Sequence, residues 1–163
     1  MGPTSERVRG VVGLLVGMTA GCGAYTVTPT EPPTMPTPEG AAKICLVRSK
    51  NESALATYPL KDNNILVGAT VNGSCFCYFA AAGQHDLEIR TDGFDELKVD
   101  VKPGKEYVLL QRMTVAAGKV RSQLERTDEA RGAAAMKQCQ YSILTEVPDG
   151  TYHAKPDSVV VAK

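Results

Sequence analysis

The sequence predicts a mainly β fold, an antiparallel β-sandwich with one short C-terminal helix, for residues 41–147. Pairs of turn-forming residues recur at short intervals through this region, which is typical of tight hairpins. The stretches between these pairs alternate apolar and polar residues, as half-buried strands do. Short strands separated by regular turns favour a sandwich over a helical or α/β fold. The turn pairs are Asn63-Asn64, Asn72-Gly73, Ala82-Gly83, Asp92-Gly93, Pro103-Gly104 and Ala117-Gly118.

Alternation and composition locate the strands within this region. Leu97, Val99 and Val101 would face a core, while the residues between them are charged. The stretch 106–114 is more continuously apolar, which is typical of a strand with neighbours on both sides. The predicted strands span residues 43–48, 65–67, 74–80, 85–91, 97–101, 106–114, 120–124 and 139–147.

One helix is predicted at residues 128–138, between the last two strands. Thr127 can cap its N-terminus through the side-chain hydroxyl. Asp128 and Glu129 suit the positive end of the helix dipole. Gly132 weakens the helix, because glycine is a poor helix former.

The first 21 residues have the organisation of a secretory signal peptide. Arg7 and Arg9 precede an apolar run at residues 10–18, and small residues follow it. The run is about half as long as the ~20 residues that span a bilayer as a helix. An uncleaved membrane anchor is therefore the alternative to export with cleavage, and export is expected.

The residues Ala20-Gly21-Cys22 resemble the bacterial lipobox, in which small residues precede a cysteine. The resemblance implies that Cys22 becomes the lipidated first residue of a membrane-anchored mature protein. The usual box carries leucine where this chain has Thr19, so ordinary cleavage nearby and a freely soluble product remain the alternative. In Gram-negative lipoproteins, an aspartate directly after the lipidated cysteine tends to retain the protein in the inner membrane, and this chain has Gly23 at that position. This implies an outer-membrane or cell-surface location in a Gram-negative source.

Residues 22–40 are predicted to form a tether and residues 148–163 a mobile C-terminal tail. The stretch 26–38 is rich in proline and has no hydrophobic period, so it should stay extended and solvated. As a spacer it would hold the domain about 40 Å from the lipid. A plain disordered N-terminal tail would have the same composition. In the C-terminal tail, residues 158–162 could add a short strand.

A series of short motifs runs through residues 64–113. A polar turn leads to V-G, an aromatic strand ends in A-A-G-Q-H, and a D-G turn precedes a strand that closes with K-P-G-K-E-Y. This pattern resembles the small β-sandwich domain of unknown function found in bacterial lipoproteins, and is similar to PEGA-type surface modules. The resemblance covers residues 41–147. It implies a prealbumin-like or Ig-like sandwich on the envelope surface and supplies no catalytic residues.

If Cys22 is lipidated, four cysteines remain, and an even number in an exported chain favours disulfides. Cys75 and Cys77 lie two residues apart on one strand, at the edge of disulfide reach. Each is therefore expected to pair with Cys45 or Cys139. The pairing Cys77–Cys139 with Cys45–Cys75 is preferred. The reverse pairing stays open, because spacing alone does not separate the two.

The sequence favours a non-catalytic, lipid-anchored envelope protein that serves binding, scaffolding or assembly, without cofactor or metal. Basic and acidic residues balance at 18 each, which does not suit a nucleic-acid partner. No phosphate-binding loop or nucleophile elbow is evident. His85 is interpreted as a surface or strand-end histidine. The expected partners are the membrane, other envelope proteins and cell-wall glycan, and no small-molecule substrate is indicated.

Two alternative functions stay open. A glycan- or peptidoglycan-binding module would use Tyr58, Phe76 or Tyr78 as exposed aromatic residues, although the chain has no tryptophan. A thiol or zinc protein would combine the cysteines with His85. The Cys-x-Cys spacing of this chain, however, differs from the spacing of structural zinc sites.

Overall fold

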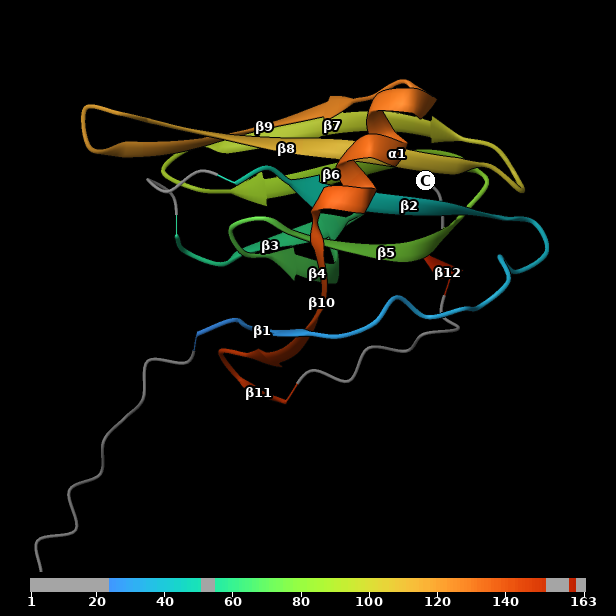
Figure 1. Ribbon diagram of the computed structural model, residues 1–163, viewed down its shortest axis with the longest axis horizontal. Coiled ribbons are helices and arrows are strands. Elements are labelled where there is room, and N and C mark those ends of the chain that lie inside the picture. Colours follow the sequence, from blue (N-terminus) through green and yellow to red (C-terminus); the bar gives the residue numbers. More distant parts are fainter. Residues whose placement is uncertain (1–23, 51–54, 152–158, 161–163) are drawn as a thin grey trace, which may run out of the picture.

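The computed structural model describes residues 24–50, 55–151 and 159–160, and it has a mainly β fold with two sheets and one short helix (Figure 1). The predicted signal peptide and Cys22 lie outside the described residues. The larger sheet contains, in spatial order, β1 (Thr26–Pro29), β10 (Gln140–Val147), β5 (Ser74–Ala81), β2 (Ala41–Arg48), β8 (Glu106–Ala116) and β9 (Lys119–Arg126), with β11 (Gly150–Thr151) beside β10 and β12 (Val159–Val160) beside β5. The smaller sheet contains β4 (Ile65–Thr70), β3 (Tyr58–Asp62), β6 (Gly83–Arg90) and β7 (Phe94–Val101), and the helix α1 spans Glu129–Gln138.

The larger sheet is mixed, whereas the sequence predicts antiparallel pairing throughout. Strand β8 runs parallel to β2, and both β10 and β12 run parallel to β5. The reason lies in the order of the strands along the chain. After β2, the chain builds the whole smaller sheet and β5 before it returns as β8 beside β2. A long crossover of this kind permits parallel neighbours, whereas a two-residue hairpin does not.

The main core lies between the two sheets, and the period-two pattern explains how β2 contributes to it. Ile44 and Leu46 point into the core and are fully buried, whereas Cys45 and Val47 point to the opposite face. Each large aliphatic side chain buried in this way stabilises the fold by about 1.5–3 kcal/mol. The buried core residues are Ala42, Ile44, Leu46, Leu60, Phe76, Ala80, Leu87, Ile89, Val99, Val101, Leu109 and Leu124.

A second, smaller cluster covers the outer face of the larger sheet. Val47, Cys75, Leu110 and Tyr141 are buried there, and Met136 of α1 packs against them. The helix crosses in front of β8 and β2 in Figure 1, and β10 leads from its end to β1 and β11. Both faces of the central strands are therefore covered, which is why β8 is almost continuously apolar in its middle, as predicted for a strand with two neighbours.

Strand β1 lies within the predicted tether and changes its interpretation. Thr26–Pro29 pairs antiparallel with β10, and the Thr26 hydroxyl donates to Oε2 of Glu146 over 2.8 Å. These residues are extended and mostly exposed, as predicted, but the prediction of a free spacer is wrong for them, because they pair with the edge of β10. A proline is tolerated at such an edge position. Since Thr26 is only four positions after Cys22, the chain between them spans at most about 14 Å instead of 40 Å.

Smaller differences concern the ends of the elements. Asp128, and not Thr127, is the N-cap of α1, because its side chain accepts a hydrogen bond from the Arg131 amide. The Thr127 hydroxyl donates instead to the carbonyl of Val108 in β8. Strand β3 was not expected from its short, proline-containing sequence. In the predicted C-terminal tail, Val159–Val160 forms a strand, as the sequence indicated for residues 158–162.

Candidate functional site

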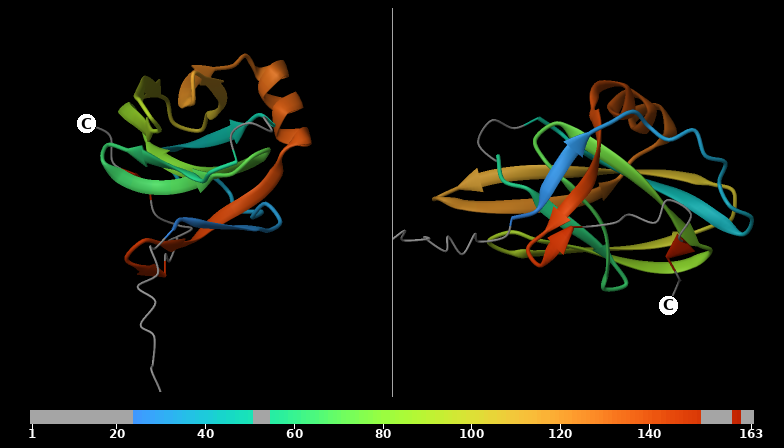
Figure 2. Two further views of the ribbon diagram at one scale, coloured as in Figure 1. Left: turned by 90° about the vertical axis from the view of Figure 1, so that its left-hand side faces the viewer. Right: turned by 90° about the horizontal axis from the view of Figure 1, so that it is seen from below.

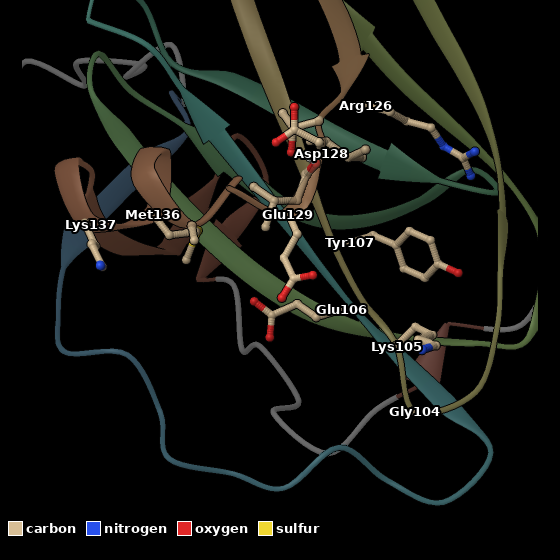
Figure 3. Close-up of a pocket in the computed structure, with 13 residues that line it drawn as sticks. Gly104, Lys105, Glu106, Tyr107, Arg126, Asp128, Glu129, Met136 and Lys137 are labelled. Carbon is tan, nitrogen blue, oxygen red and sulfur yellow. Dashed lines mark hydrogen bonds between the residues drawn. The ribbon is translucent and has the colours of Figure 1, made fainter. Parts of the chain in front are cut away.

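A cleft of about 860 Å³ opens between α1, the beginning of β8 and the end of β9 (Figure 3). Its origin is the register of the two strands. Strand β9 pairs with β8 only from Leu109 onward, opposite Arg126, and the chain then turns away at Thr127 to enter α1. Glu106 and Tyr107 at the start of β8 consequently have no β9 neighbour, whereas α1 approaches the strand at Val108.

The cleft has an apolar floor and a charged rim. Val108 and Met136, which also belong to the smaller cluster, contribute apolar surface, and Tyr107 contributes an aromatic ring. Figure 3 shows the carboxylates of Glu106 and Glu129 pointing toward one another across the opening. The residues that line the rim carry both signs of charge and are Lys105, Glu106, Arg126, Asp128, Glu129 and Lys137.

This arrangement can hold a partner that presents apolar surface together with charges of both signs. Among the described residues, no group of three histidine, cysteine or acidic side chains is placed to hold a metal ion. The sequence offered no motif for the cleft, because its residues come from three separate segments and meet only through the tertiary fold.

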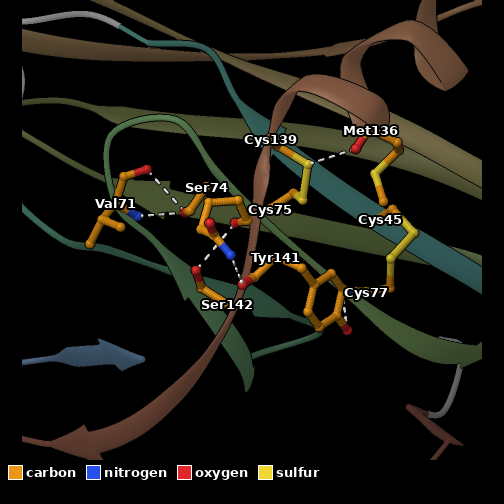
Figure 4. The surroundings of a disulfide bond; sticks show 10 residues. Cys45, Val71, Ser74, Cys75, Cys77, Met136, Cys139, Tyr141 and Ser142 are labelled. Carbon is orange, nitrogen blue, oxygen red and sulfur yellow. Dashed lines mark hydrogen bonds between the residues drawn. A yellow bond between two sulfur atoms is a disulfide. The ribbon is translucent and has the colours of Figure 1, made fainter. Parts of the chain in front are cut away.

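The four cysteines of the domain form two disulfides on the outer face of the larger sheet (Figure 4). Cys45 bonds to Cys77, and Cys75 bonds to Cys139. The prediction that these four cysteines form disulfides is confirmed, but the preferred pairing was wrong and the reverse pairing is present.

The register of β2 and β5 explains the pairing. Cys45 lies directly opposite Cys77, with 4.0 Å between their Cα atoms. A bond from Cys45 to Cys75 would instead run along a diagonal of about 7–8 Å, which is too long for a disulfide. Cys75 then meets Cys139, which follows α1 and sits 5.7 Å away between Cα atoms. The bridge ties the end of the helix to the centre of the sheet.

The two disulfides indicate an oxidising, extracytoplasmic environment. Each closes a loop of tens of residues and is expected to stabilise the domain by about 3–4 kcal/mol. The sequence has five cysteines, and the two disulfides join four of them. Cys22 is the cysteine that neither disulfide contains.

His85 lies in a buried hydrogen-bonded group with Asp62 and Tyr78, so its interpretation as a surface or strand-end histidine was wrong. The side chains of His85 and Asp62 are both 0% exposed, and Nδ1 of His85 lies 2.8 Å from Oδ2 of Asp62. Its Nε2 lies 2.8 Å from the carbonyl of Ala81. Both ring nitrogens therefore face oxygen atoms that can accept a hydrogen bond. The Tyr78 hydroxyl donates to Oδ2 of Asp62 over 2.9 Å.

Burial dominates the electrostatics of this group. It raises the pKa of Asp62 above the usual value, an effect that hydrogen bonding and charge interaction with His85 oppose. Burial also raises the pKa of Tyr78 well above its usual value, and the neighbouring Asp62 carboxylate adds to the rise. The group resembles acid–base machinery in composition, but the side chains of His85 and Asp62 are not exposed to solvent.

A sequence signal for the buried histidine did exist. His85 shares the period-two face of β6 with Leu87 and Ile89, both fully buried, so the alternation placed it on the core side. No comparable signal identified Asp62, which joins the group through the pairing of β3 with β6.

The three aromatic residues considered for glycan binding differ in their exposure. Phe76 is only 4% exposed and belongs to the main core, so its expected exposure was wrong. Tyr58 and Tyr78 are half-buried. Tyr78 packs against the same core, and the guanidinium of Arg48 lies 5.0 Å from the ring centre of Tyr58.

In the part of the chain that the structure describes, no helix has the length and apolar character to cross a membrane. Comparison with protein-family models, with curated proteins and with solved structures finds no match. The resemblance to the sandwich domains of bacterial lipoproteins stays a prediction from sequence motifs.

Proposed function

We propose that this chain is a lipid-anchored, non-catalytic protein of the cell envelope, whose sandwich of prealbumin-like or Ig-like class serves binding, scaffolding or assembly. One observation carries the proposal. The two disulfides consume every cysteine of the domain and leave Cys22 alone, directly after the small residues Ala20 and Gly21. An unpaired cysteine with a free thiol would be reactive in an oxidising compartment, whereas a cysteine whose sulfur forms a thioether to lipid would not. Lipidation therefore accounts for an unpaired cysteine at position 22.

The remaining features support a binding role. The acid–base group around His85 is sealed in the core, whereas the cleft beside α1 is open and combines an apolar floor with charges of both signs. Such a surface suits a protein partner in the envelope. Turnover of a substrate by the purified protein would contradict the proposal.

The two alternative functions have less support. Of the aromatic side chains considered for glycan binding, Phe76 is buried and Tyr58 and Tyr78 are half-buried. The cysteines proposed for a thiol or zinc site are joined to one another.

Intact mass spectrometry of the membrane-extracted protein tests the proposal directly. The expected chain begins at Cys22 and carries acyl groups and two disulfides, and the outer-membrane fraction contains it, as Gly23 implies. Cys22→Ser should abolish both acylation and membrane retention. Thr19→Leu, which restores the usual lipobox, is the matched control and should leave the product unchanged. A mature chain that begins elsewhere and carries no lipid would refute the proposal.

A further inference from the structure

The hairpin between β8 and β9 and the turn between β6 and β7 form one exposed surface. Val115 and Val120 lie opposite each other in the hairpin. The amide of Val120 donates to Oδ2 of Asp92 over 2.7 Å, and the Asp92 amide donates to the carbonyl of Val120 over 3.2 Å. We call this surface the tip and define it by Arg90, Phe94, Val115, Lys119 and Arg121.

The tip exposes two large apolar side chains. Phe94 is 53% exposed and Val115 is 40% exposed. Both belong to elements whose other apolar residues are largely buried, so their exposure is not a consequence of a poorly formed core. Exposed apolar residues grouped in this way indicate a contact surface.

Basic side chains surround these apolar residues. The guanidinium of Arg90 lies 5.7 Å from the ring centre of Phe94, and that of Arg121 lies directly against Gly93. Lys119 is exposed at the end of the hairpin. The nearby Asp92 and Asp95 carboxylates are turned toward β9, where they accept hydrogen bonds from backbone amides. The Arg90 guanidinium also lies 3.9 Å from the Glu88 carboxylate, and Asp92 is exposed. Among the described residues, Lys119 and Arg121 are therefore the exposed basic residues of the tip that form no ion pair with a carboxylate.

The start of β1 and the tip lie toward the same end of the strands, at the left of Figure 1 and of the view from below in Figure 2, although β1 and β9 form opposite edges of the larger sheet. The chain from Cys22 to Thr26 reaches at most about 14 Å. A lipid on Cys22 would therefore hold this end of the domain toward the bilayer.

We propose that the tip is a second membrane contact, which docks on an anionic lipid surface beside the anchor. Phe94 and Val115 would enter the headgroup region, and the three basic residues would pair with anionic headgroups. The orientation relative to the membrane rests on the proposed lipidation of Cys22, whereas the affinity of the tip for lipid does not.

This contact would give the cleft beside α1 a defined orientation. The cleft lies at the start of β8 and the tip at its end, and the strand of 11 residues is about 35 Å long. With the tip on the bilayer, the cleft faces the aqueous phase and remains open to a partner.

Vesicle co-sedimentation of residues 24–163 tests the tip without any lipid on the protein. This part of the chain contains every described strand, the core and both disulfides, and so holds the whole fold. It should sediment with vesicles of phosphatidylcholine containing about one third phosphatidylglycerol, and far less with phosphatidylcholine alone. Lys119→Glu with Arg121→Glu should weaken binding about 30-fold or more. Phe94→Ser with Val115→Ser should weaken it about tenfold.

Matched controls come from elsewhere on the domain. Lys50→Glu with Lys102→Glu makes the same charge change at exposed positions outside the tip and the cleft, and Ile65→Ser removes a side chain on β4 that is 50% exposed. Both should bind as the unaltered domain does, and thermal unfolding should show all variants folded. Equal weakening by tip and control variants, equal binding to neutral vesicles, or no binding at all would overturn the inference. Mass spectrometry of Cys22 decides lipidation separately, so either proposal can fail alone.

Discussion

At the scale of single residues, the most consequential side chain is the buried His85. One ring nitrogen contacts Asp62 on β3, and the other contacts the carbonyl of Ala81 at the end of β5. The ring therefore links the smaller sheet to the larger sheet where the chain passes from β5 to β6. A buried, hydrogen-bonded pair of ionisable groups adds little net stability compared with apolar packing, but it is costly to break once present. The contact joins β3 to β6, so a shift in the register of these two strands would break it.

Removal of the Asp62 carboxylate should destabilise the domain. Asp62→Ala is expected to lower the free energy of unfolding by about 3–5 kcal/mol, because His85 keeps its buried position without its partner. Urea unfolding followed by circular dichroism measures the change. Asp100→Ala, an exposed aspartate on β7, should stay within about 0.5 kcal/mol of the unaltered protein. A small loss for Asp62→Ala would show that the pair is not formed.

The cysteine pairing can be read from peptides, because Phe76 separates Cys75 from Cys77. Chymotryptic cleavage after Phe76 under non-reducing conditions should yield one peptide pair that contains Cys45 and Cys77. A second pair should contain Cys75 and Cys139. The pairing preferred from the sequence would give the opposite combination, so mass spectrometry distinguishes the two directly.

At the scale of elements, the contact between α1 and β8 depends on a glycine. The sequence indicated only that Gly132 weakens the helix. In the structure Gly132 is buried, and a Cβ at this position would lie 2.9 Å from Cβ of Val108 and 2.8 Å from the Thr127 hydroxyl oxygen. The glycine permits the close approach that the Cys75–Cys139 bridge also requires.

Two opposing effects determine the result of Gly132→Ala. Alanine would improve helix propensity by about 1 kcal/mol, whereas the clash with β8 would cost about 1–3 kcal/mol. The Cβ of Val108 is fixed by its strand, and the Thr127 hydroxyl is held by its hydrogen bond to the Val108 carbonyl. We therefore expect a net loss of about 1 kcal/mol. Ala133→Gly, at an exposed position of the same helix, isolates the propensity effect. A thermal melt that rises for Gly132→Ala would contradict the close contact.

At the scale of the whole molecule, the two sheets are joined along one side by carboxylates. Asp95 of β7 accepts a hydrogen bond from the amide of Leu124 in β9, and Asp92 accepts one from Val120. These bonds occupy amides on the outer edge of β9, which would otherwise be free to pair with another chain. Burial raises the pKa of Asp95, while its backbone hydrogen bonds oppose the rise.

Loss of this connection should loosen the edge of the sheet. Asp95→Ala is expected to lower stability by about 1.5–3 kcal/mol and to increase hydrogen exchange at the Leu124 amide. Light scattering should detect association through the exposed edge of β9. Asp95→Asn keeps an acceptor oxygen and is the matched control, with a smaller effect on both measurements. Unchanged exchange at Leu124 in Asp95→Ala would refute the role of the carboxylate.

Local features of the sequence determined the secondary structure of the domain. Turn pairs and period-two alternation located most strands, and the charged first turn located α1, because these signals depend only on neighbouring residues. The even number of domain cysteines likewise indicated disulfides. Alternation also placed His85 on the buried face, although its environment was misinterpreted.

The tertiary structure alone decided which segments meet. Alternation tells which face a side chain occupies, but not which strand lies beside it, so the Cys45–Cys77 pair and the parallel neighbours β2 and β8 were not predictable. The pairing of β1 with β10 and the cleft beside α1 join segments that are far apart in the sequence. Such contacts depend on how the complete chain buries its apolar surface, and no local pattern records that outcome.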